Sequence, residues 1–124
     1  MIPDGGAVVL GVGLEAGTPV SHVHDLLARL GIDLDAASVV ATVDTRASEP
    51  ALLALAEGRA LRTFPAAELD RVDVPHPSPV VRRLTGTGSV AEAAALLAAG
   101  PGGVLLVEKA RGAGVTVALA RSGP

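Results

Sequence analysis

The sequence predicts an α/β fold, a three-layer α/β/α arrangement with a mixed, mostly parallel sheet and a C-terminal β-hairpin. Short apolar runs of strand type alternate with segments of helical periodicity, which favours a parallel sheet covered by helices on both faces. Residues 109–114 carry the strongest hairpin signal, and a hairpin requires an antiparallel pair. The 124 residues, of which 49% are hydrophobic, are enough for one core, so we expect a single domain over residues 1–124.

The first strand and the first helix are expected within the first quarter of the chain. Residues 7–13, AVVLGVG, form a continuous apolar run, which is typical of a buried strand. Thr18 followed by Pro19 has the pattern of a helix N-cap and a first helical residue. Apolar residues then recur at helical spacing until Gly31, which is expected to end the helix.

The middle of the chain repeats the strand–helix alternation. Residues 38–44, SVVATVD, are expected to form a second strand, and residues 60–64, ALRTF, a third. Between them, a helix is expected to start at residues 48–50, where a proline follows two polar residues, and to end at Gly58. Residues 65–72 are expected to form one or two helical turns.

The last third of the chain contains a connector, a helix and the hairpin. Residues 74–79 hold three prolines in six positions, which forbids regular structure there, and residues 80–84 are expected to form a short helical piece. An alanine-rich helix is expected to begin at Val90. The two hairpin strands are expected at residues 102–109 and 114–121.

The alanine-rich helix and the glycine turn before it are the most unusual stretch. Ser89 and Glu92 have the spacing of a capping box. Gly86 and Gly88 allow the backbone to turn and a ligand to approach it, and the N–H groups at a helix start attract anions. The alanines have a structural explanation, because small side chains let a helix lie close to a sheet and alanine has the highest helix propensity.

Ligands of α/β folds bind beyond the carboxyl ends of the strands. Residues 11–18 and 44–49 form two loops that are expected at this edge, and the glycine turn before the alanine-rich helix joins them if it lies at the same edge. In the second loop, Arg46 lies between Asp44 and Glu49. Either the three side chains form a local ion pair and helix cap, or Arg46 holds a ligand carboxylate in a two-pronged contact.

The first loop nearly matches the dinucleotide-binding fingerprint. Gly11, Gly13 and Ala16 fit a G-x-G-x-x-A pattern, but no acidic residue closes a second strand at the spacing the fingerprint requires. Nucleotide binding is therefore the disfavoured interpretation, and a tight turn is the favoured one.

Composition argues against several other classes of function. A net charge of −3 and one aromatic residue, Phe64, are atypical of nucleic-acid binding. Without cysteine there is no thiol chemistry, and His22 and His24 point about 200° apart on a helix, so we expect no metal site and no cofactor. No apolar run reaches about 18 residues and no signal peptide is visible, so we expect a cytoplasmic protein without a membrane partner.

Five motifs in order resemble a known family. They are GVGLEAGT, ATVDTRASEPALLALAE, VPHPSPVV, TGTGSVAEAAALLAAG and LLVEKARGAGVTVALAR. Together they resemble the C-terminal domain of the cobalt-precorrin-5A hydrolases (CbiG) and the stand-alone CobE proteins of vitamin B12 biosynthesis, from about Val8 to Arg121. The resemblance implies a three-layer fold and a role in building the corrin ring. In the two-domain relatives the enzyme opens a lactone on a cobalt-precorrin and releases acetaldehyde.

The resemblance also implies a site for a tetrapyrrole with several carboxylates. Arg46 stands where the family has a lysine, and a family lysine is retained as Lys109, whereas Leu14, Glu15 and Ala16 replace basic residues of the family. Asp44 and Glu49 are the expected catalytic carboxylates, with Glu92 as a further candidate base. The expected substrate-binding residues are Gly11, Gly13, Thr18, Arg46, Gly86, Thr87, Gly88, Ser89 and Lys109.

Two functions follow from the resemblance. The first is hydrolysis of a precorrin lactone, in which a carboxylate acts as the base and the two cations stabilise developing negative charge. The second is a non-catalytic role, as a tetrapyrrole carrier or as a partner of another corrin-pathway enzyme. The same residues bind the pigment in both.

Overall fold

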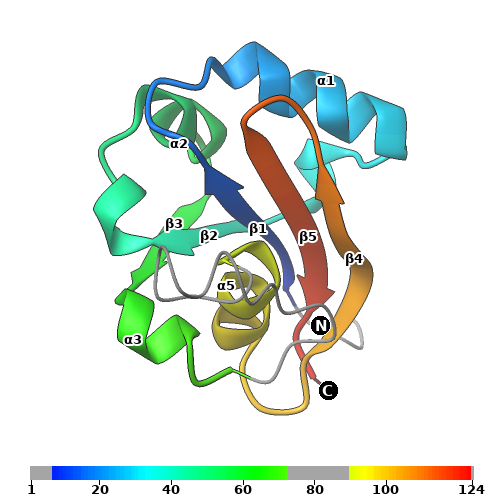
Figure 1. Cartoon of the computed structure of the whole chain (residues 1–124). Helices are drawn as coiled ribbons and strands as arrows, with labels where there is room; N and C mark the ends of the chain where they lie inside the picture. Colours follow the sequence, from blue (N-terminus) through cyan, green and yellow to red (C-terminus); the bar gives the residue numbers. More distant parts are fainter. Residues whose placement is uncertain (1–6, 73–89, 124) are drawn as a thin grey trace.

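The computed structural model describes residues 7–72 and 90–123, which build one five-stranded mixed sheet with the strand order β3-β2-β1-β5-β4 (Figure 1). Strand β1 is parallel to β2 and β2 to β3, whereas β5 is antiparallel to both β1 and β4. β4 therefore runs in the direction of β1, and only β5 is reversed among the described strands. The mixed, mostly parallel sheet and its C-terminal hairpin are confirmed. The strands are β1 (Val8–Leu14), β2 (Val39–Val43), β3 (Ala60–Phe64), β4 (Val104–Arg111) and β5 (Val115–Arg121).

Helices cover both faces of the sheet, which confirms the three layers (Figure 1). One face carries α1 and α2, and the opposite face carries α3 and α5. Two single-turn 3₁₀ helices, η1 and η2, flank β2. The bounds are α1 (Val20–Leu30), η1 (Leu34–Ala36), η2 (Asp44–Arg46), α2 (Pro50–Leu55), α3 (Ala66–Leu69) and α5 (Val90–Ala99).

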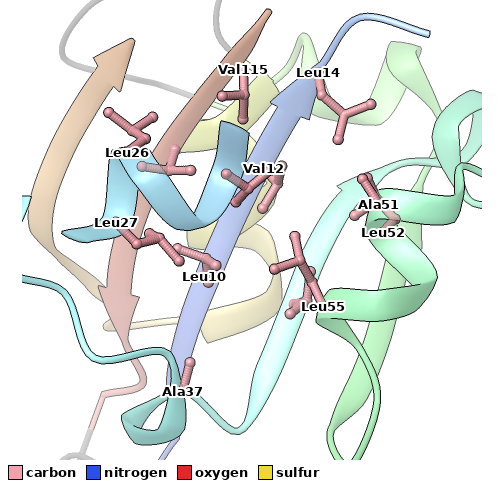
Figure 2. Packing of buried hydrophobic residues seen from close by; sticks show 13 residues of the cluster. Leu10, Val12, Leu14, Leu26, Leu27, Ala37, Ala51, Leu52, Leu55 and Val115 are labelled. Carbon is pink, nitrogen blue, oxygen red and sulfur yellow. The ribbon is translucent and has the colours of Figure 1, made fainter. Parts of the chain in front are cut away.

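Large aliphatic side chains fill the layer between the sheet and α1 and α2 (Figure 2). Leu10 and Val12 of β1 are fully buried there, and Leu26 of α1 and Leu52 and Leu55 of α2 pack on the same side. Burying one such side chain stabilises the fold by roughly 1.5–3 kcal/mol. This layer holds β1 and β2 in the positions from which their carboxyl ends reach the surface.

The layer between the sheet and α5 is built from small residues instead. Ala91 and Ala95 of α5 lie directly over Gly11, where an added Cβ would overlap the Ala91 carbonyl oxygen and lie 2.9 Å from the Ala95 Cβ. A Cβ at Gly13 would lie 3.2 Å from the Cβ of Val90. The alanines thus let the helix approach the strand, as the sequence predicted. The expected loop at residues 11–18 starts too early, because Gly11 and Gly13 lie inside β1.

The start of α1 differs from the expectation. Its N-cap is Pro19, in an extended conformation, and the helix begins at Val20, so the predicted Thr18 cap is wrong. The Thr18 hydroxyl instead lies 2.8 Å from the Glu15 carbonyl oxygen and 3.2 Å from that of Gly114. The predicted end of the helix is confirmed, since Gly31 adopts a left-handed conformation with φ of 71°.

Three predicted segments lie outside the described residues. They are the proline connector at 74–79, the short helix at 80–84 and the glycine turn at 86–89. Within the described part, no helix is long and apolar enough to cross a membrane.

Candidate functional site

Two loops meet beyond the carboxyl ends of β1 and β2. Arg46 reaches from the end of β2 to the end of β1, where its Nε donates a hydrogen bond of 2.9 Å to the Leu14 carbonyl oxygen. Glu49 crosses in the same direction, and its Oε1 accepts a hydrogen bond of 2.9 Å from the Gly17 N–H. These two side chains therefore fasten the β2–α2 loop to the β1–α1 loop, and both loops lie at one edge of the sheet, called the carboxyl edge below.

The turn of the β4–β5 hairpin joins the same edge. The Glu15 N–H donates to the Gly114 carbonyl oxygen at 2.9 Å, close to the Thr18 hydroxyl. His22 Nδ1 lies 3.1 Å from the Ala113 carbonyl oxygen. Because these contacts join segments almost a hundred residues apart, the local sequence pattern carries no signal for them.

The first turn of α5 also lies at the carboxyl edge. Val90 packs over Gly13 near the end of β1, whereas Ala95 packs over Gly11 farther back. The helix therefore runs opposite to β1, and its first N–H groups point beyond the strand ends. Gly86, Thr87, Gly88 and Ser89 precede this helix but lie outside the described residues, so their part in the site stays a prediction.

Arg46 is half-buried, and the described residues use only one of its nitrogens as a hydrogen-bond donor. Its Nε is used by Leu14, but no acceptor within residues 7–72 and 90–123 contacts its two terminal amino groups. Among these residues it also forms no ion pair with Asp44 or Glu49, so the local ion-pair interpretation does not hold for the described part. Asp44 is exposed beside it. The guanidinium is thus held at one nitrogen and keeps a fork of donors that matches a carboxylate.

Lys109 lies in β4, the strand at the opposite end of the sheet from β3. Since β4 is separated from β1 by β5, the two strands are about 10 Å apart at a spacing of roughly 4.8 Å per strand. Lys109 is half-buried, and its main-chain N–H donates a hydrogen bond of 3.0 Å to Oε2 of Glu92 in the first turn of α5. Lys109 is therefore tied through its main chain to the first turn of α5, whose Val90 packs over Gly13 near the end of β1.

An open hollow of about 450 Å³ lies beside these loops, between the starts of α1 and α2. Its walls are mostly apolar, and the Glu49 carboxylate is the charged group in them. It could accept an apolar part of a ligand whose charged groups contact the edge. The lining residues are Gly17, Thr18, Pro19, Val20, Glu49, Pro50, Ala51 and Ala54.

The structure thus brings Thr18, Arg46 and Glu49 together, with Asp44 next to them. Gly11 and Gly13 lie beneath α5 instead, where the helix covers their backbone. The G-x-G pattern consequently forms no phosphate-binding turn, which removes the main support for nucleotide binding. Within the described chain, no three His, Asp or Glu side chains gather as metal ligands.

Comparison with known proteins identifies relatives over nearly the whole chain. Residues 8–120 match the family model described as cobalamin synthesis G C-terminus. Protein CobE of Sinorhizobium sp. is 40% identical over an alignment of 124 positions that covers 94% of this chain and 80% of the relative.

Solved structures give the same result. A crystal structure of CobE, described as a protein from the cobalamin (vitamin B12) biosynthetic pathway, superposes with a TM-score of 0.81 at 32% identity over 93% of each chain. Cobalamin biosynthesis protein ChiG from Agrobacterium tumefaciens strain C58 shares the fold, with a TM-score of 0.67 at 24% identity over 94% of this chain and 99% of the other. The chain therefore belongs to the cobalamin synthesis G C-terminus family and is a protein of cobalamin biosynthesis.

Proposed function

We propose that the protein binds a tetrapyrrole intermediate of cobalamin biosynthesis, a precorrin or cobalt-precorrin, at the carboxyl edge. Such intermediates carry several acetate and propionate groups, which need a few well-placed cations and main-chain donors rather than a basic surface. The observation that carries the proposal is the guanidinium of Arg46. It is fixed at Nε, and its two terminal nitrogens have no acceptor among the described residues.

Three features add to this support. Lys109 lies in edge strand β4, two strands away from β1, and supplies a second cation for a further carboxylate of the same macrocycle. The start of α5, over the end of β1, adds main-chain N–H groups and the positive end of the helix dipole. The neighbouring hollow offers apolar walls to the ring.

A visible-absorbance titration of hydrogenobyrinic acid tests binding. The wild-type protein is expected to give a saturable spectral shift, and the Arg46→Ala/Lys109→Ala double variant is expected to lose it. Arg29→Ala is the control, because Arg29 is exposed in the last turn of α1, away from the carboxyl edge. Equal shifts in the wild type and the double variant would contradict the proposed site.

Lactone hydrolysis is the second candidate function, and the position of Glu49 favours it. One of its oxygens is held by the Gly17 N–H, and the side chain lines the hollow. As a base it would take a proton from water, whose oxygen attacks the lactone carbonyl; the ring C–O bond then breaks, and the proton passes to the leaving oxygen to give a carboxylic acid and an alcohol. Loss of the alcohol proton and cleavage of the adjacent C–C bond, whose electrons stay on the macrocycle, would then release the two-carbon fragment as acetaldehyde. Asp44, exposed nearby, is the alternative base.

An acetaldehyde assay with a cobalt-precorrin lactone separates the two functions. A hydrolase predicts release that falls at least about 100-fold in Glu49→Gln or in Asp44→Asn while pigment binding is retained. A carrier predicts binding without release in every variant.

A further inference from the structure

A carboxylic acid is fully buried in the most apolar helix of the protein. Glu92 lies in the first turn of α5 among alanines, and its side chain is 0% exposed. Burying a polar group of this kind costs stability unless it is hydrogen-bonded. The buried carboxyl therefore needs a hydrogen-bond partner on a neighbouring element.

The contact is made to an irregular part of β4. Val107 lies opposite Leu119 and Ala110 opposite Val117, so β4 contains one residue more than β5 over this interval. Such a β-bulge takes a residue out of the regular ladder and changes the direction of the side chains around it. Lys109 lies within this interval, and its N–H donates a hydrogen bond of 3.0 Å to Oε2 of Glu92.

We infer that Glu92 is a positioning residue, which fixes the bulge in β4 and thereby the place of the Lys109 side chain. This inference rests on the proposed function, in which the Lys109 ammonium binds a carboxylate of the tetrapyrrole. Glu92 itself does not touch the ligand, because its side chain is covered completely. The role also replaces the expectation that Glu92 is a base, since a base must reach the reacting water.

A double-mutant cycle on the whole protein tests the inference. Hydrogenobyrinic acid is titrated against wild type, Glu92→Ala, Lys109→Ala and the double variant, with Ala94→Gly as a control that destabilises the same helix away from the bulge. Glu92→Ala is expected to raise Kd about tenfold in the wild-type background and less than about twofold in the Lys109→Ala background. Glu92→Gln keeps an acceptor oxygen for the Lys109 N–H and is expected to bind within about threefold of wild type.

The Lys109 amide gives a readout that does not depend on the ligand. Its hydrogen exchange, followed by ¹⁵N NMR, is expected to speed up at least about tenfold in Glu92→Ala and to stay near wild type in Glu92→Gln and Ala94→Gly. If Glu92→Ala does not fold, Glu92→Gln decides: a protected amide with retained binding supports the inference, and a protected amide with lost binding overturns it.

Binding by the two single variants distinguishes a failure of this inference from a failure of the proposed function. If Lys109→Ala weakens binding and Glu92→Ala does not, the positioning role is wrong and the site stands. If Glu92→Ala weakens binding equally in both backgrounds, its effect is general to the fold and the inference is overturned. If Lys109→Ala binds as wild type does, the use of Lys109 in the proposed function is wrong, and the positioning role falls with it.

Discussion

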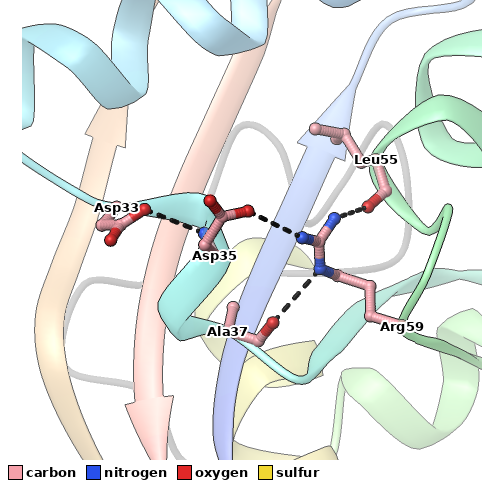
Figure 3. Close-up of polar contacts among 5 residues, drawn as sticks. All are labelled: Asp33, Asp35, Ala37, Leu55 and Arg59. Carbon is pink, nitrogen blue, oxygen red and sulfur yellow. Dashed lines mark hydrogen bonds and ion pairs between the residues drawn. The ribbon is translucent and has the colours of Figure 1, made fainter.

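Two arginines, one at each edge of the sheet, use the same side chain in different ways. At the amino edge, Arg59 directs Nε to the Ala37 carbonyl oxygen at 3.1 Å and Nη1 to that of Leu55, while Nη2 lies 3.6 Å from the Asp35 carboxylate (Figure 3). Its side chain is 14% exposed. At the carboxyl edge, Arg46 makes one hydrogen bond to the described residues, from Nε to Leu14.

The two guanidinium groups differ in how far the described residues satisfy their donors. All three nitrogens of Arg59 contact the chain itself, which closes the amino edge around the entries to β2 and β3. Arg46 is anchored at one nitrogen, so the guanidinium has a defined place while its terminal donors face no described acceptor. A charged side chain that is placed but not satisfied is typical of a binding site.

Gly11→Ala is expected to have the largest effect, because it would push α5 away from β1. The new Cβ would meet the main-chain oxygen of Ala91, which no side-chain movement can relieve. We expect a loss of about 3 kcal/mol or more in the free energy of unfolding, measured by urea denaturation. Gly13→Ala is the milder control, since its Cβ would meet the Val90 side chain at 3.2 Å. Equal effects of the two would contradict the close approach of α5 at Gly11.

Arg59→Ala is expected to come next and to act on stability alone. It leaves the Ala37 and Leu55 carbonyl oxygens without their guanidinium donors at a partly buried position. We expect a loss of about 2 kcal/mol in the free energy of unfolding, measured in urea. Pigment affinity, measured on the folded variant, should stay at the wild-type value. A weakened affinity would mean that the two edges do not differ as described.

Asp35→Ala is expected to have the smallest effect. The carboxylate is 94% exposed and lies 3.6 Å from Nη2 of Arg59, so solvent screens the ion pair. We expect the free energy of unfolding to change by less than about 0.5 kcal/mol. A loss as large as that of Arg59→Ala would show that the ion pair, rather than the two carbonyl contacts, braces the amino edge.

The fold was largely predictable because it depends on local periodicity. Residues 60–64 form the expected third strand, and the remaining expected helices and strands lie close to their observed bounds within the described chain. The arrangement of the candidate site was predictable only in part. Arg46 and Glu49 follow a strand, so the strand-end rule finds them.

The errors share a physical cause, which is contact between distant segments. Thr18 has the local pattern of a cap, but its hydroxyl lies against the hairpin turn 96 residues away. Gly11 and Gly13 have the local pattern of a loop, but α5 covers them from a segment some 80 residues later in the chain. The bond between Glu92 and Lys109 depends on a bulge, which strand alternation does not reveal.

The most direct test of this account is one paired titration of hydrogenobyrinic acid, with Arg46→Ala and Arg59→Ala measured beside the wild type. The two variants remove the same side chain from opposite edges of one sheet. We expect Kd to rise about tenfold or more for Arg46→Ala, equivalent to about 1.4 kcal/mol, and to stay at the wild-type value for folded Arg59→Ala. Unchanged binding by Arg46→Ala, or equal weakening in both variants, would contradict a tetrapyrrole site at the carboxyl edge.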